Sequence, residues 1–165
     1  MSGKIVFIDG HSILNRAFYG LPDLTASGGR HTGAVYGFLN ILFKILEEEQ
    51  PDYLTIAFDT HAPTFRHKMY EAYKGTRHPM PEELAMQLPV MKDVLRAMRT
   101  PIFECEGWEA DDVIGTIGKR CGSAGWDCVI VTGDRDSLQL IDDHVTVKLV
   151  SSKLSQTVAV NYDPA

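Results

Sequence analysis

The chain has 165 residues, of which 44% are hydrophobic and 23% charged, and its formal net charge is −6. This length suits one domain with its own core, and the composition is that of an ordinary soluble globular protein. No stretch approaches the roughly 20 apolar residues that a membrane span needs, and the apolar run at residues 5–8 is too short for a secretory signal. Membrane and secreted classes are therefore not expected.

The cysteines and the distribution of charge indicate the redox compartment and the kind of binding partner. The three cysteines, Cys105, Cys121 and Cys128, form no Cys-x-x-Cys pair. We expect buried free thiols in a reducing compartment, not disulfides or a zinc site. The acidic balance argues against a nucleic-acid binder, which is usually basic. However, positive charge concentrates at residues 66–77, and carboxylates concentrate in a few short motifs.

The first elements in chain order are a strand and two helices. An apolar run at residues 4–9 ends in Asp-Gly, which predicts a buried strand and a turn. A short helix is expected at residues 13–19 with Ser12 as its N-cap. Residues 33–50 have helical apolar spacing, and Pro51 follows the end of that helix.

The middle of the chain is less regular. Residues 53–59 form a second buried strand pattern that again ends in aspartate. Residues 60–80 have no clear period and are dense in basic and aromatic side chains. Residues 82–98 are helical, although Pro89 should split or kink the helix. A short strand is expected at residues 102–104.

The last third returns to alternating elements. A helix at residues 109–121 begins in acidic residues, and a third apolar strand follows at 128–132. A short helix is expected at 137–141, and 145–150 with 157–160 look like a closing pair of strands. This alternation predicts an α/β fold with a mostly parallel central sheet and helices on both faces.

Carboxylates follow three of the expected strands. Asp9 and Asp59 end the first two, and Asp134 with Asp136 come just after the third. In an open α/β sheet, ligands bind beyond the carboxyl ends of the strands. We therefore expect these side chains to converge on one edge of the sheet.

A helix start adds three more acidic residues, namely Glu109, Asp111 and Asp112. One acid there would complement the helix dipole, but three in four positions exceed what capping uses. Like charges packed together resist ionising, so cations among them are the simplest explanation. Oxygen-only ligands suit Mg²⁺ or Mn²⁺, and two such ions about 4 Å apart can activate water against a phosphodiester. Each aspartate alone would more often be a turn residue.

Basic and aromatic residues follow the second strand and so start at the same edge. Arg and Lys can bind phosphates and Tyr can stack on bases, which makes this segment a candidate DNA-binding surface or, alternatively, a solvated loop. Its candidate residues are Arg66, Lys68, Tyr73, Lys74 and Arg77. Lys74 and Arg77 would share one helix face and so one phosphate.

Other residues near this edge have simpler interpretations. Arg16 and Tyr19 follow the first strand and join the candidate DNA-binding set. His11 is interpreted as a turn residue, since its oxygen-rich neighbours do not favour a histidine ligand. Trp108 and Trp126 are expected in the core.

Several motifs occur in the order found in one known family. The chain resembles the 5′-nuclease domain of bacterial DNA polymerase I, in the flap endonuclease superfamily with its PIN-like (resolvase-like) three-layer sheet. The resemblance covers essentially the whole chain. The motifs that carry it are Phe7-Ile8-Asp9-Gly10, Thr32-Gly33-Ala34-Val35-Tyr36-Gly37-Phe38, Ala57-Phe58-Asp59, Tyr73-Lys74-Gly75-Thr76-Arg77, Glu109-Ala110-Asp111-Asp112 and Thr132-Gly133-Asp134-Arg135-Asp136.

The resemblance implies a role for each acidic residue. Asp9, Asp59, Glu109 and Asp111 would surround a first Mg²⁺ or Mn²⁺ ion. Asp111, Asp134 and Asp136 would face a second ion, and Asp112 would lie near both. It also implies that Lys74 and Arg77 contact the scissile phosphate while Tyr73 stacks on a base. Arg16 and Arg66 match further basic positions of the family's site.

The resemblance also implies a division of the longer family domain. Residues 1–165 would be the PIN-like catalytic core, with an arch or clamp at about 60–80. The family's helix-hairpin-helix region, which grips duplex DNA, is absent from this chain, so the second metal site is expected to be incomplete. We expect a monomer that is fused to a polymerase domain in its parent protein and lies in the cytoplasm with the bacterial nucleoid.

The implied activity is metal-dependent hydrolysis of DNA at 5′ ends or flaps, in replication and repair. Three alternatives remain at this stage. One is a PIN-type ribonuclease, and another is a catalytically incomplete DNA-binding fragment. The third is a small-molecule phosphatase, which is disfavoured because Asp9 is followed by Gly10 and His11 and not by a second aspartate two residues on.

Overall fold

The expected α/β fold is confirmed. The computed structural model describes residues 3–60, 62–70, 79–153 and 156–164. Its centre is a six-stranded sheet in the order β3-β2-β1-β4-β5-β6, in which every neighbouring pair is parallel except β5 and β6. The strands are β1 (Lys4–Asp9), β2 (Tyr53–Ala57), β3 (Ile102–Phe103), β4 (Asp127–Thr132), β5 (Val145–Lys153) and β6 (Gln156–Tyr162).

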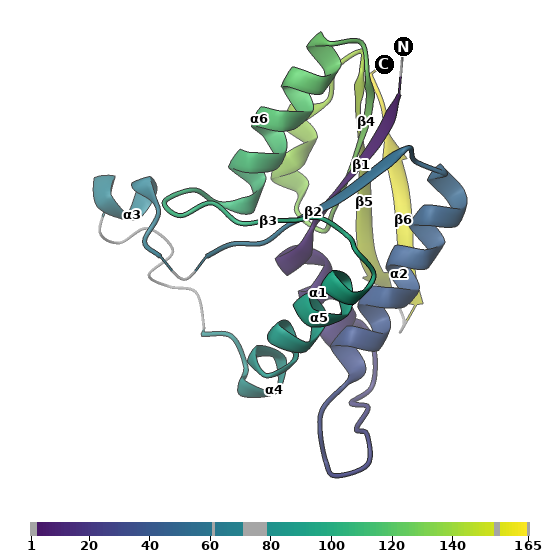
Figure 1. Cartoon of the computed structure of the whole chain (residues 1–165), viewed down its shortest axis with the longest axis vertical. Coiled ribbons are helices and arrows are strands. Elements are labelled where there is room, and N and C mark those ends of the chain that lie inside the picture. The colour runs from purple at the N-terminus through teal and green to yellow at the C-terminus, as the bar shows by residue number, and fades with distance from the viewer. Residues whose placement is uncertain (1–2, 61, 71–78, 154–155, 165) are drawn as a thin grey trace.

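Helices cover both faces of this sheet and make three layers (Figure 1). Alternation along β1 explains the two cores, since Val6 and Ile8 face one layer while Phe7 faces the other. The first core includes α1, α2, α4 and α5, and the second includes α6 and the short helix η1. The helices are α1 (Gly10–Gly20), α2 (Gly33–Glu49), α3 (Phe65–Met69), α4 (Glu82–Ala85), α5 (Gln87–Ala97), α6 (Ala110–Ser123) and η1 (Arg135–Leu140).

The start of α1 differs from the sequence expectation. The helix begins at Gly10, and its N-cap is Asp9, whose Oδ1 accepts a hydrogen bond from the Ser12 backbone N–H at 3.0 Å. Ser12 is therefore inside the first turn and is not the cap. This N-cap gives the last residue of β1 a second role, because the same carboxyl group ends the strand and begins the helix.

The split expected at Pro89 occurs three residues earlier. The chain turns at Met86 between α4 and α5, and Pro89 lies in the first turn of α5. A proline fits there because the first helical N–H groups have no partner inside the helix. The helix expected at residues 137–141 is the 3₁₀ helix η1, which begins slightly earlier.

The lengths and compositions of the described helices test whether one of them could span a membrane. None of them is long and apolar enough to cross a bilayer. The proposed arch at about 60–80 is described in part, and within it α3 is a five-residue helix. Tyr73, Lys74 and Arg77 lie outside the described residues.

Candidate metal centre at the carboxyl edge of the sheet

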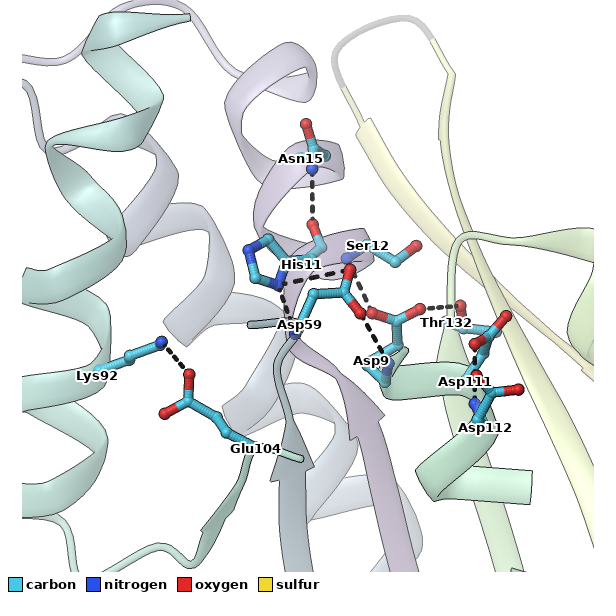
Figure 2. Close-up of polar contacts among 11 residues, drawn as sticks. Asp9, His11, Ser12, Asn15, Asp59, Lys92, Glu104, Asp111, Asp112 and Thr132 are labelled. Carbon is cyan, nitrogen blue, oxygen red and sulfur yellow. Dashed lines mark hydrogen bonds and ion pairs between the residues drawn. The ribbon is translucent and has the colours of Figure 1, made fainter. Parts of the chain in front are cut away.

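Parallel pairing brings three strand ends to one edge. In the register of the sheet, Asp9 of β1 lies beside Ala57 of β2, and Ile8 lies beside Val131 of β4. Asp59 is two residues past Ala57, and Thr132 is one past Val131. The convergence predicted for Asp9 and Asp59 is therefore present, and Figure 2 shows these two side chains and Thr132 turned toward one another.

Asp9 lies at the centre of this edge. Its Oδ2 accepts a hydrogen bond from the Thr132 hydroxyl at 3.1 Å, while its Oδ1 caps α1. Burial raises the pKa of the Asp9 carboxyl group to about 6, and the negative charges of Asp59 and Asp111 add to the increase. Carboxylates that follow β2 and begin α6 therefore act on the carboxyl group at the end of β1.

Asp59 connects the end of β2 to the start of α6. Its Oδ1 accepts a hydrogen bond of 2.7 Å from the Ala110 N–H, in the first turn of that helix. Its backbone N–H donates to Nδ1 of His11 at 3.0 Å, and the same nitrogen lies 4.0 Å from Oδ2 of Asp59. His11 is thus a hydrogen-bond acceptor for the backbone of an acidic site residue, and the turn interpretation missed this role.

The acidic start of α6 serves the helix as well as the site. Glu109 is the N-cap, and its side chain forms a reciprocal capping box with Asp112. Glu109, Asp111 and Asp112 each offer a carboxylate oxygen within 4.8 Å of the other two. Burial raises the pKa of Asp111, and the charges of Asp112 and Glu109 raise it further. Capping uses two of the three acids, so it does not explain the third.

Arg66 of α3 lies against this acidic group. Its two terminal nitrogens donate to the two carboxylate oxygens of Asp112 at 2.6 and 2.7 Å. Its Nη1 also lies 3.6 Å from Oε2 of Glu109. A two-point arginine–carboxylate pair is strong and geometrically specific. This cation therefore attaches the segment after β2 to the N-terminus of α6 and partly balances the acidic charge.

The turn after β4 is attached to α1. The Ser12 hydroxyl accepts a hydrogen bond from Gly133 N–H at 2.8 Å, and Arg16 donates to the Gly133 carbonyl at 2.8 Å. A Cβ at Gly133 would meet Arg16 Nε at 2.5 Å and Ser12 Oγ at 3.0 Å, so this close approach favours glycine. These contacts hold the start of η1 beside the β1 carboxylate.

Asp134 and Asp136 occupy this turn. Asp134 N–H donates to the Thr132 hydroxyl at 3.1 Å, and Asp134 Oδ1 caps η1 by accepting from Asp136 N–H at 3.0 Å. Both aspartates are exposed. Thr132 therefore connects Asp9 to Asp134, a link that β4 ending in threonine could have suggested. Asp134 and Asp136 lie outside the group of three acids at the start of α6.

Two other candidate residues have weaker structural constraints. Tyr19 is 69% exposed at the end of α1, with its ring 5.0 Å from that of Phe18. Lys68 is exposed on α3, two residues after Arg66. Both positions are open to solvent, as a DNA-contacting side chain would be, and their predicted roles stay predictions.

The donor set fits a hard divalent cation. The convergent ligands are carboxylates, and the three-acid group at α6 contains oxygens close enough to share one ion. Burial raises the pKa of Asp9, and the negative charges of Asp59 and Asp111 raise it further. A bound cation would reverse that local balance and favour the ionised carboxylates. The site thus has the composition and the electrostatics of a divalent-metal centre.

Comparison with known proteins agrees with this geometry. Residues 4–163 match the family model described as "5'-3' exonuclease, N-terminal resolvase-like domain". DNA polymerase I of Caldicellulosiruptor bescii is 50% identical over 155 residues, which cover 94% of this chain and 18% of that protein. The 5′-3′ exonuclease of Aquifex aeolicus is 40% identical over 143 residues, covering 87% of this chain and 50% of that one.

Solved structures show the same fold at low sequence identity. Bacteriophage T5 5′-exonuclease with bound zinc ions superposes with a TM-score of 0.68 at 20% identity, covering 94% of this chain and 57% of that one. The T5 flap endonuclease with DNA and metal ions also gives 0.68, at 18% identity, covering 93% of this chain and 57% of that one. The chain thus spans about a fifth of the matched polymerases and about half of the matched nucleases. From the family model that matches nearly all of its residues, the chain belongs to the family of 5′-3′ exonuclease N-terminal resolvase-like domains.

Proposed function

We propose that this chain is the catalytic part of a divalent-metal-dependent nuclease that cuts DNA at 5′ ends or flaps. The observation that carries the proposal is the convergence of Asp9, Asp59 and the acidic start of α6 at one sheet edge. Family membership supports it, as do the named activities of the relatives. The T5 neighbour that contains DNA and metal ions supports DNA as the substrate.

The acidic residues would divide between two ions. The first would be held by Asp9, Asp59, Glu109 and Asp111, and the second by Asp111, Asp134 and Asp136 with Asp112 nearby. Because all of these ligands are oxygens, Mg²⁺ or Mn²⁺ suits the site better than zinc. When bound, such ions supply charge stabilisation for in-line attack of water on a phosphodiester.

The chain's own groups prepare the site for that reaction. Thr132 orients Asp9, and the first-turn N–H of α6 orients Asp59. The Arg66–Asp112 pair holds α3 against the acidic group, so the segment that follows starts at the site. Lys74 and Arg77 would bind the scissile phosphate and stabilise its developing charge. Arg16, Tyr19, Lys68 and Tyr73 would contact the DNA strand around it.

The proposal extends to the cellular setting. Relatives named DNA polymerase I carry a matching region within a much longer chain, which supports fusion of this core to a polymerase domain. Residues 1–165 would then form the catalytic core, with an arch at about 60–80. The protein would act as a monomer in the cytoplasm, where the bacterial nucleoid supplies its substrate.

The test is cleavage of 5′-labelled flap DNA by this chain in Mg²⁺, Mn²⁺ or EDTA. Products cut near the flap junction are expected with either metal and not with EDTA. The Asp9→Asn variant should lose at least about 100-fold in rate, because it removes a ligand charge. Asp93→Asn is the matched control, since Asp93 is an exposed carboxylate paired with Arg96 on α5.

The alternatives predict different results in the same assay. Cleavage of an RNA flap but not the DNA flap would favour a PIN-type ribonuclease. Binding of flap DNA without cleavage in either metal would instead favour a non-catalytic DNA-binding module. Equal rates for Asp9→Asn and the unmodified chain would contradict the proposed centre.

A further inference from the structure

We propose that Trp108, supported by Phe65, is a stacking platform for a nucleobase of the DNA strand that runs past the acidic site. This inference rests on the proposed function, because it assumes that single-stranded DNA approaches this edge. It assigns a ligand contact to a side chain that was expected in the core.

The exposure of this aromatic group is the first observation. Trp108 is 50% exposed, and Met69 at the end of α3 and Tyr70 just after it are 80% and 66% exposed. A surface tryptophan alone would be ordinary, since large rings are rarely fully buried. Here an exposed aromatic ring directly precedes the acidic group and packs against Phe65, the neighbour of Arg66, which binds Asp112.

The ring is held in place before any ligand arrives. The Trp108 and Phe65 ring centroids lie 4.9 Å apart at an interplanar angle of 49°. Phe65 N–H donates to the Gly107 carbonyl at 3.0 Å, and Trp108 N–H donates to the Cys105 carbonyl at 3.2 Å. Gly107 has φ of +84°, a conformation that favours glycine and forms the turn that presents Trp108. A preorganised ring loses little entropy when a base stacks on it.

Continuity with the acidic site is the second observation. Trp108 directly precedes Glu109, the N-cap of α6. The guanidinium carbon of Arg66, Cζ, lies 4.6 Å from the centroid of the Phe65 ring, and the same guanidinium group pairs with Asp112. One arginine therefore attaches the aromatic pair to the carboxylates, so a strand at the metal centre passes within reach of the platform.

The surrounding charge indicates which part of a nucleotide would lie there. Without a bound metal, the three acids at the start of α6 repel phosphate groups, but they do not repel an uncharged base. Every base has a flat π-face that can stack on an aromatic side chain without sequence preference. The occupant is therefore a nucleobase of single-stranded DNA, with its phosphates directed toward the basic residues and the metals.

The experiment uses tryptophan fluorescence, because the chain has two tryptophans. Trp126 packs against Tyr53 with ring centroids 5.2 Å apart, and it also adjoins Gly3, which precedes β1. Trp126→Phe leaves Trp108 as the sole reporter, and Trp108→Phe leaves Trp126 as the control. Both are titrated in EDTA and low salt with oligothymidylate, and with an abasic oligomer of equal phosphate number. Anisotropy of end-labelled DNA measures binding independently.

The expected result is that oligothymidylate quenches Trp108 and leaves Trp126 unchanged, while the abasic oligomer quenches neither. Trp108→Leu should weaken binding of oligothymidylate by about fivefold to a hundredfold, and binding of the abasic oligomer by less than about twofold. Binding without quenching of Trp108, or equal quenching by the abasic oligomer, would overturn the platform alone. Failure of the unmodified chain to bind either oligomer would also overturn the platform, whereas the proposed function fails only if flap DNA is not cleaved in Mg²⁺ or Mn²⁺.

Discussion

At the residue scale, burial of the Asp9 carboxyl group makes the folding free energy of the metal-free chain depend on pH. Its folded-state pKa of about 6 lies above the ordinary aspartate value of 3.8, and burial is the main cause. Between these pH values the folded chain keeps a proton that the unfolded chain releases. The contribution of Asp9 to the free energy of unfolding is therefore most favourable below about pH 4. It falls as pH rises and is least favourable above about pH 6.

Replacing Asp9 with Asn should therefore stabilise the metal-free chain at pH 7. Removing the buried charge is worth at most about 3 kcal/mol, and rearranging the Thr132 hydrogen bond reduces that gain. The gain should vanish near pH 4, where Asp9 is protonated in both states. Urea unfolding of both proteins at pH 4 and 7, in EDTA, measures this. An unchanged or lower stability at pH 7 would contradict the assigned cause.

His11 should affect the site through the backbone of Asp59. Since Nδ1 of His11 accepts the Asp59 N–H, the neutral ring carries its proton on Nε2. His11→Leu fills similar volume without an acceptor, and its affinity for Mn²⁺ should fall about 10- to 100-fold, as for other groups that orient ligands. His11→Asn, whose Oδ1 can replace Nδ1, should retain most of the affinity.

Titration calorimetry with Mn²⁺ compares the three proteins without relying on cleavage. The His11→Leu variant must also keep the unfolding midpoint of the parent to within a few degrees. If it binds Mn²⁺ as the unmodified chain does, the hydrogen bond to Asp59 has no positioning role.

At the scale of elements, one glycine in α1 and one in α6 differ in the space that a side chain would have. A Cβ at Gly10 would lie 2.6 Å from Cζ of the buried Phe58 ring, which follows β2. In contrast, a Cβ at Gly118 of α6 would meet its nearest atom, Ile130 Cδ1, at 3.8 Å. The strand-to-helix turn after β1 thus has no space for a methyl group at Gly10, whereas α6 can accommodate one at Gly118.

The alanine variants of these glycines should change stability in opposite directions. Gly10→Ala should lower the free energy of unfolding by about 1–3 kcal/mol, the usual cost of overpacking a core. Gly118→Ala should raise it by roughly 0.5–1 kcal/mol, because alanine loses less backbone entropy in a helix. Denaturant unfolding of the two variants gives the comparison. A stable Gly10→Ala protein would show that the Phe58 ring moves aside easily.

Strands and helices were more predictable than their junctions. Continuous apolar runs correctly located β1, β2 and β4, and Asp9 and Asp59 lie at one edge of the sheet as predicted. The start of α1 was placed too late, because Asp9 competes with Ser12 for the cap and tertiary packing favours the earlier one. Trp108 was expected in the core, since composition cannot tell a packed ring from one placed on a glycine turn.

The site's connecting groups were the least predictable part. Thr132, Ser12 and His11 act through single hydrogen bonds to residues distant in sequence, and such pairings leave no periodic pattern. The Cys105 thiol is exposed, which contradicts the expected burial, whereas Cys128 is buried and burial raises its pKa to about 12. Local composition therefore predicted the acidic residues at this edge but not the groups that orient them.

At the scale of the whole molecule, a partly buried ion cluster joins the sheet to α2. Lys148 of β5 is 3% exposed, and its ammonium group binds Glu48 at 2.8 Å and also Glu49. Glu49 binds Lys4 of β1 at 2.6 Å as well. Two strands that β4 separates are thus tied to the end of one helix, through ion pairs that involve none of the acidic residues of the candidate site.

Removing the buried cation should destabilise the fold without altering metal affinity. Lys148→Met leaves Glu49 partly buried with one partner, and the free energy of unfolding should fall by roughly 2 kcal/mol. Lys44→Met is the matched control, because Lys44 and Glu48 form an exposed pair at 3.8 Å that should contribute less than about 0.5 kcal/mol. Urea unfolding at pH 7 provides both values, and Mn²⁺ titration should give equal affinities.

The pH dependence of the same variant tests the cause. Lys148 lowers the pKa values of Glu48 and Glu49, with Lys4 contributing at Glu49 although burial acts in the opposite direction. A lowered carboxyl pKa stabilises the fold above about pH 4.5, and that stability is lost as pH falls through the folded value. The difference between Lys148→Met and the unmodified chain should therefore be largest near neutral pH and shrink toward pH 3. A difference that is constant with pH would mean that Lys148 stabilises the fold by packing and not by charge.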